Sequence, residues 1–200
     1  MKKKIILLAL IALAVANGYS QEQGGFRVGL DFGFVPSSGG GGGMFSIEPK
    51  FNIKDNMNVG LRIGGAAIVR DLEGEDGGTT TAKIAASSSF VGTYDYYFHK
   101  SGSSFAPYVG AGVGYYSLAN VEIDDTTTEL PDSFSAAVSG EMGGLIRAGF
   151  EWGKFRLGVE YNLVPDSDLE DINGNVVGTA KNAYLGIHLG FFVGGGKWGK

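Results

Sequence analysis

The segment from Lys154 to Pro165 limits the possible folds of this chain more than any other. A β-strand sends successive side chains to opposite faces, so this segment has an apolar face and a polar face that carries charges of both signs. In a soluble β-protein the apolar face would form the core, whereas in a membrane barrel it would face lipid and the charged face would line the lumen. The apolar residues are Phe155, Leu157, Val159, Tyr161 and Leu163, and they alternate with Arg156, Gly158, Glu160 and Asn162.

Seven further segments show the same alternation, and no helical period is found beyond Gly25. The connections between the segments are alternately short and long, which is typical of a barrel with tight turns on one rim and long loops on the other. Pro49 interrupts the second segment and leaves a bulge there as an alternative to a regular strand. The sequence predicts an all-β fold, an eight-stranded antiparallel up-and-down transmembrane β-barrel. Its expected strands are residues 26–35, 44–53, 58–70, 83–98, 105–118, 135–152, 154–165 and 181–193.

The start of the chain is typical of a secretory signal peptide over residues 1–20. Three lysines precede an apolar run over residues 5–16, which is too short to span a bilayer as a helix. We expect residues 21–200 to form a single exported domain with a short tail at 194–200. The chain has no cysteine, which excludes disulfides and thiolate metal sites, and no basic block that would indicate nucleic-acid binding.

Three observations favour lipid outside the barrel over the alternative, a soluble ligand-binding barrel with an apolar interior. Glycines concentrate on the polar faces, where a crowded lumen explains them better than open water does. Aromatic residues lie near strand ends on the apolar faces, as in interfacial girdles. The charges on the polar faces balance, and a sealed lumen requires this because buried charges must be paired. The expected lumen charges are Arg27, Lys50, Arg62, Arg70, Arg147, Arg156, Asp31, Glu48, Asp95, Glu141, Glu151 and Glu160.

The signal peptide, the eight alternating segments and the glycine and aromatic pattern of residues 107–116 resemble the small outer-membrane β-barrels of the OmpA, OmpX and OmpW type. The resemblance implies a place in the bacterial outer membrane, with membrane lipid and the barrel assembly machinery as partners. It also implies an assembly signal in the last strand, although the chain continues through residues 194–200 where the family typically ends on its aromatic residue. The residues similar to that signal are Tyr184, Gly186, Leu189 and Phe191.

The second, third and fourth long connections are acidic and hold no Lys or Arg. One interpretation is a solvated, repulsive surface. The other is weak binding of Ca²⁺ or Mg²⁺ by oxygen ligands, with Asp166, Asp168 and Asp171 as the candidates. No other cofactor is expected.

The function predicted from these features is a structural or surface-interaction role through the acidic loops, with an unidentified extracellular ligand. A narrow porin-like channel is the main alternative. A lipid-modifying enzyme is a weaker one, because the sequence has His188 and Gly190 where one similar class of enzymes has a His-x-Ser motif. We therefore expect no catalytic residues and no enzymatic activity.

Two hairpins allow the pairing of residues to be predicted. A two-residue turn at Gly153 and Lys154 would place Trp152 opposite Phe155, and would set Arg147 opposite Glu160 in the lumen. In the hairpin around residues 54–56, opposing residues must share a face. We expect that hairpin to pair Ile53 with Met57, Lys50 with Gly60, and Glu48 with Arg62.

Overall fold

The structure, a computed structural model, describes residues 23–37, 41–72, 81–122, 137–170, 176–196 and 198. The predicted signal peptide lies outside these residues. No helix in this described part is long and apolar enough to cross a membrane. The strands in it are β1 (Phe26–Val35), β2 (Gly41–Lys54), β3 (Met57–Leu72), β4 (Thr81–Tyr97), β5 (Phe105–Glu122), β6 (Ala137–Trp152), β7 (Phe155–Leu163), β8 (Ser167–Glu170), β9 (Val176–Ala180) and β10 (Tyr184–Gly194).

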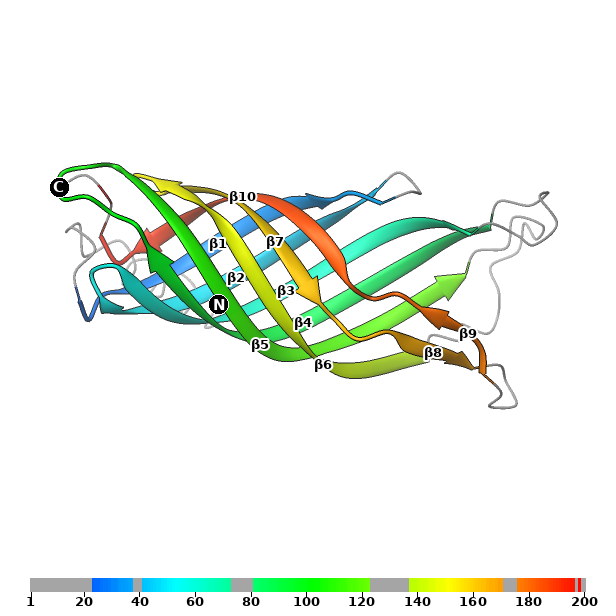
Figure 1. Ribbon diagram of the computed structural model, residues 1–200. Helices are drawn as coiled ribbons and strands as arrows, with labels where there is room; N and C mark the ends of the chain where they lie inside the picture. The colour runs from blue at the N-terminus through cyan, green and yellow to red at the C-terminus, as the bar shows by residue number, and fades with distance from the viewer. Residues whose placement is uncertain are drawn as a thin grey trace, which may run out of the picture.

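Eight of these described strands form a closed antiparallel barrel in the order β1-β10-β7-β6-β5-β4-β3-β2 (Figure 1). Pairing of β1 with both β2 and β10 closes the sheet, so the barrel has no free edge strand. The predicted eight-stranded barrel is confirmed.

One expectation about the connections was wrong. The fourth long connection, expected as a loop, contains a separate two-stranded sheet of β8 and β9. In Figure 1 this hairpin lies at the end of the barrel away from the short turns. Its strands are only four and five residues long, which is too short for the alternation to stand out in the sequence.

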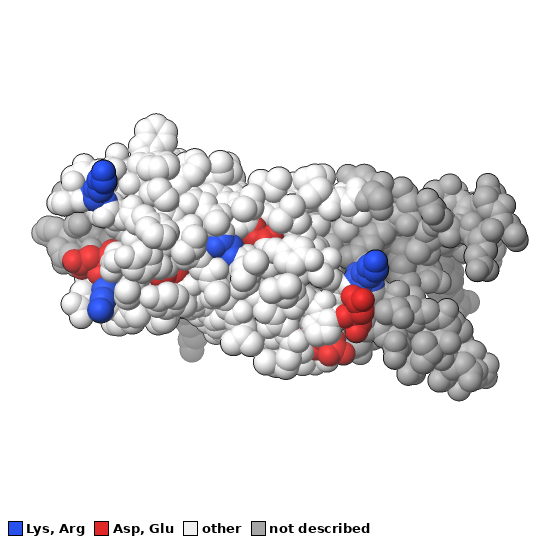
Figure 2. All heavy atoms as spheres, in the orientation of Figure 1, with Lys and Arg blue, Asp and Glu red and all other residues white. Residues whose placement is uncertain are grey.

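The outer surface of the barrel is apolar, as predicted. Leu157, Val159, Leu185 and Ile187 are between 41% and 46% exposed, so they point away from the lumen. Along β7, exposed and buried residues alternate without a break. In the view of Figure 2 the middle of the barrel is mainly free of charged residues, apart from one small charged area. The soluble alternative, in which these side chains would form a dry core, is therefore wrong.

The β6–β7 hairpin has the predicted register. Gly153 has a φ of 61° in the two-residue turn, and Trp152 faces Phe155. The predicted pairing of Arg147 with Glu160 is present, and so are the other pairs that this register requires: Glu151–Arg156, Phe150–Leu157, Gly149–Gly158, Ala148–Val159, Ile146–Tyr161 and Leu145–Asn162.

The β2–β3 hairpin differs from the prediction next to its turn. The register shifts between Asn52 and Lys54, so Lys54 rather than Ile53 faces Met57. The cause is an extra residue in β2, as in a β-bulge. Pro49 causes no such shift, because the register is the same on both sides of it: Ile47 faces Ile63, and Lys50 faces Gly60.

Candidate functional site

The barrel lumen holds a balanced set of buried charges. Five cationic and five anionic side chains point inward among the described residues, so their formal charges sum to zero. A buried ion is tolerated only when it is paired and hydrogen-bonded. These residues are Arg27, Lys50, Arg62, Arg147, Arg156, Asp31, Glu48, Asp95, Glu151 and Glu160.

Arg147 connects three strands at the centre of this network. Its Nε donates to Asp95 Oδ1 at 2.8 Å, and its Nη2 donates to Glu48 Oε1 at 2.6 Å. Lys50 Nζ lies 2.5 Å from Asp95 Oδ2 and 3.1 Å from Glu48 Oε2. The two carboxylates from β2 and β4 thus share two cations, one from β2 and one from β6.

Glu151 is the centre of a second group, near the short turns. Its carboxylate accepts hydrogen bonds from Arg27 Nη1 at 2.9 Å, Arg156 Nη2 at 2.7 Å and Tyr97 Oη at 2.8 Å. Trp198 Nε1 also donates to it, at 2.7 Å. Side chains from β1, β4, β6 and β7, together with one from beyond β10, therefore meet at a single carboxylate.

A third group includes Glu160, which accepts from Arg62 Nη2 at 2.7 Å and from Asn162 Nδ2 at 2.9 Å. Asp31 lies 3.6 Å from Arg156 Nη1 and 3.4 Å from His188 Nδ1. The barrel wall thus brings together residues from strands that are far apart in the sequence.

Two predicted ion pairs across neighbouring strands are wrong, although the residues have the predicted register or face. Arg147 stands opposite Glu160 but binds Glu48 and Asp95, and Glu160 instead binds Arg62. The expected Glu48–Arg62 contact is replaced in the same way, because Arg62 binds Glu160 and Glu48 binds Arg147. Long, flexible side chains in a narrow lumen can reach across it, so Arg147 and Arg62 bind partners on other strands instead of the residues directly opposite them. Glu151 and Arg156 are the directly opposed pair in β6 and β7 that does form an ion pair, at 2.7 Å.

Apolar and aromatic clusters fill the lumen on both sides of the charged network. The sequence analysis did not predict these clusters. Trp198 in particular was assigned to a tail outside the barrel. The clusters are Val35, Met44, Ala66, Ile68 and Tyr184; Val91, Tyr116, Leu118, Leu145 and Val164; and Tyr97, Ala106, Tyr108, Phe192 and Trp198.

The other predicted site residues have varied positions. Glu141 is half-buried, and the side chain of Arg70 lies outside the described part. Of the candidate cation ligands, Asp166 is exposed, whereas the side chain of Asp168 and all of Asp171 lie outside the described residues. Within the part that the structure describes, no group of three or more His, Asp or Glu side chains could hold a metal ion.

The predicted assembly signal lies in β10, where the strand closes against β1. Tyr184 points into the lumen, whereas Leu189 and Phe191 are exposed on the outer face. His188 also points inward and is 2% exposed.

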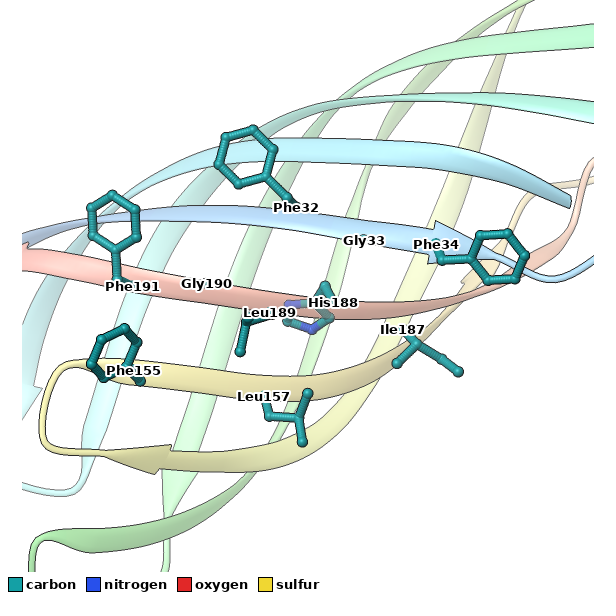
Figure 3. Close-up of a pocket in the computed structure, with 10 residues that line it drawn as sticks. All are labelled: Phe32, Gly33, Phe34, Phe155, Leu157, Ile187, His188, Leu189, Gly190 and Phe191. Carbon is teal, nitrogen blue, oxygen red and sulfur yellow. The ribbon is translucent and has the colours of Figure 1, made fainter.

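A shallow groove of about 510 Å³ runs along the outside of β1, β10 and β7 (Figure 3). Phe32, Phe155, Leu157, Leu189 and Phe191 contribute to its apolar lining. These side chains are exposed on the barrel exterior, so the groove belongs to the apolar outer surface and not to the lumen.

A closed barrel with an apolar exterior and its ionised groups inside is an integral membrane β-barrel, because a bilayer leaves no partner for free backbone or charged groups. Residues 5–191 match the family described as the outer membrane protein beta-barrel domain. The chain belongs to this family and is a protein of the bacterial outer membrane. No curated relative matches the sequence.

Solved structures with a similar fold include the outer membrane protein OprG from Pseudomonas aeruginosa, at 13% identity and a TM-score of 0.51, covering 88% of this chain and 97% of that one. Neisserial surface protein A matches at 16% identity and a TM-score of 0.49, over 84% of this chain and 95% of that one. The N-terminal β-barrel domain of OprF from Pseudomonas aeruginosa matches at 15% identity and a TM-score of 0.45, over 85% and 98%. These likenesses concern the fold.

Proposed function

We propose that this protein is a non-conducting outer-membrane barrel that acts through the connections on its long-loop rim. The observation that carries the proposal is the filling of the lumen. Ten ionised side chains point into it, and aromatic and aliphatic clusters fill further regions of it. An eight-stranded barrel is only wide enough for its own side chains, so these residues leave little room for a solute path.

The charge network supports this role in a second way. Each carboxylate at the centre of the lumen is held by more than one cation, and Thr93 Oγ1 adds a hydrogen bond to Glu48 at 2.6 Å. An ion entering this region would have to displace such partners and leave a buried charge unpaired. The network therefore favours a rigid support for the loops over a channel.

Conductance across a planar lipid bilayer tests the proposal. The purified barrel is expected to show no current steps above the protein-free bilayer. The comparison variant changes Tyr116 and Leu145 together to alanine, which removes bulk from one lumen cluster but leaves the charged network in place, so it should also show no steps. Discrete steps from the unmodified protein would contradict the proposal and favour the narrow channel.

The long-loop rim supplies the proposed binding surface. Its connections over residues 73–80, 123–136 and 171–175 each contain Asp or Glu but no Lys or Arg. Carboxylates on loops suit hard divalent cations, and a surface of this charge also attracts cationic partners. We include weak Ca²⁺ or Mg²⁺ binding at Asp166, Asp168 and Asp171 in the proposal.

Loop protection by calcium tests this second part. Calcium should slow proteolysis of the loops in the detergent-folded barrel, and changing the three aspartates to asparagine should reduce the effect. Asp55→Asn, at the opposite rim, is the matched control and should leave the effect intact. Equal proteolysis with and without calcium would contradict the cation-binding part of the proposal. The conductance measurement would still decide separately whether the lumen conducts ions.

A further inference from the structure

The chain turns back into the barrel after its last strand. Gly194, Gly195 and Gly196 have φ values of 81°, 60° and 77°, a region that residues with a side chain rarely adopt. A Cβ atom on Gly195 would lie 2.8 Å from Cβ of Arg27, so the backbone passes close to the base of β1. The reversal brings Trp198 to a position where it is only 4% exposed.

Trp198 is held by residues from the other side of the barrel. Its ring centroid lies 5.1 Å from that of Tyr97 and 4.4 Å from that of His99, at the end of β4 and just beyond it. In the closed strand order, β10 and β4 are four positions apart among eight, so they lie on opposite sides of the barrel. The segment that follows β10 thus crosses the mouth of the lumen at the short-turn end.

The indole also takes part in the buried network. Its Nε1 donates to Glu151, the carboxylate that binds Arg27 of β1 and Arg156 of β7. A tryptophan needs a partner for its N–H when it is buried, and here it finds one that three other side chains share. Trp198 is therefore held in one position by contacts of its ring and by the hydrogen bond of its indole N–H.

We propose that residues 194–196 and Trp198 form a strap that closes the mouth of the lumen at the short-turn end, with Trp198 as its plug. The strap can form only after β10 has paired with β1, because its contacts lie on strands across the closed barrel. It therefore joins the closing seam of the barrel to β4 and β6. The inference concerns the tail alone and does not depend on whether the rest of the lumen conducts.

The two tryptophans of the chain allow a direct test. Trp152 is 64% exposed on the outer, lipid-facing surface, whereas Trp198 is expected inside. W152F leaves Trp198 as the single tryptophan, and W198F leaves Trp152 as the matched control. Each variant is folded into phosphatidylcholine vesicles with iodide in the solution inside and outside them, or into vesicles made with brominated phosphatidylcholine.

The strap predicts that Trp198 is quenched by iodide several-fold less than in the urea-unfolded chain, and that brominated lipid quenches it much less than it quenches Trp152. Iodide quenching of Trp198 equal to that of the unfolded chain would place the tail in free solution and overturn the proposal. Strong quenching of Trp198 by brominated lipid would place it against the membrane and would overturn it equally.

The stability of the closed barrel gives a second readout. W198A should lower the urea midpoint of unfolding, and W198F should lower it less, because an aromatic ring remains although it is smaller and lacks the N–H donor. Lys200→Ala, in the same tail, should not change the midpoint. An unchanged midpoint in W198A would show that the tail does not hold the seam and would contradict the strap.

Discussion

Arg147→Met is expected to destabilise the barrel by about 3 kcal/mol, roughly a hundredfold in the unfolding equilibrium. Arg147 donates four hydrogen bonds to two buried carboxylates, those of Glu48 and Asp95. Removing one member of a buried ion pair typically costs about 3–5 kcal/mol, because the partner is left unpaired. Here Lys50 and Arg156 remain within 3.3 Å of Glu48, so we expect the lower end of that range.

A pair of double-mutant cycles distinguishes contact across the lumen from pairing between neighbouring strands. Asp95→Asn combined with Arg147→Met removes one charge of each sign from groups in contact, and we expect a coupling energy of about 0.5–3 kcal/mol. Glu160→Gln combined with Arg147→Met changes the net charge equally, although Glu160 binds Arg62 instead. The second cycle should therefore show the smaller coupling.

The assay is reversible urea unfolding of the barrel in lipid vesicles, followed by tryptophan fluorescence and by the shift in gel mobility between folded and unfolded forms. Each single and double variant gives a free energy of unfolding, and the cycles give the couplings. A coupling of Arg147 with Glu160 as large as that with Asp95 would refute the cross-lumen network and restore pairing by strand register.

Three further perturbations address packing, the lipid face and the charge group near the short turns. Gly158→Ala should cost about 1–3 kcal/mol of unfolding free energy, because its new methyl group would lie 2.5 Å from the hydroxyl oxygen of the buried Tyr108. The control Gly92→Ala, where the nearest atom is 3.7 Å away, should be nearly neutral, and equal costs would argue against a packed lumen. Val159→Arg, at the middle of a lipid-facing strand, should cost about 2–4 kcal/mol in a bilayer, and a neutral result would contradict lipid exposure. Glu151→Gln should cost about 3–5 kcal/mol, because two arginines lose their shared carboxylate. Glu141→Gln, at a half-buried position, is its control, and similar unfolding midpoints for the two variants would show that the group near the short turns is not energetically important.

Local backbone geometry made much of this fold predictable. The two-residue period of a strand determines which face each side chain occupies, so the inner and outer residues of β7 and β10 could be assigned from their alternation. A tight turn likewise determines the register of its hairpin, which is why all the predicted pairs of β6 and β7 are present. Where the turn region carries an extra residue, next to Lys54, the same reasoning was wrong by one position.

Features without such a local signal could not be predicted. The tail after β10 holds one tryptophan among glycines and lysines, and nothing in that pattern indicates that the chain reverses into the lumen. The β8–β9 hairpin is too short for its alternation to differ from that of a loop. The position of the tail depends on contacts that exist only once the barrel is closed, whereas the β8–β9 hairpin is a local pairing of two short strands.

The sequence by itself determined that the charges lie inside, and tertiary structure decided which of them meet. A side chain's face depends on its own strand, whereas its partner depends on how closure arranges strands around the lumen. Arg147 binds residues 52 and 99 positions away in the chain, on β4 and β2, while its immediate neighbour on β7 binds elsewhere. The balance of charges could be counted from the residues on the inner faces of the strands. Which cation binds which carboxylate could not, because it depends on the narrow, closed lumen, in which an arginine can bind residues on a distant strand.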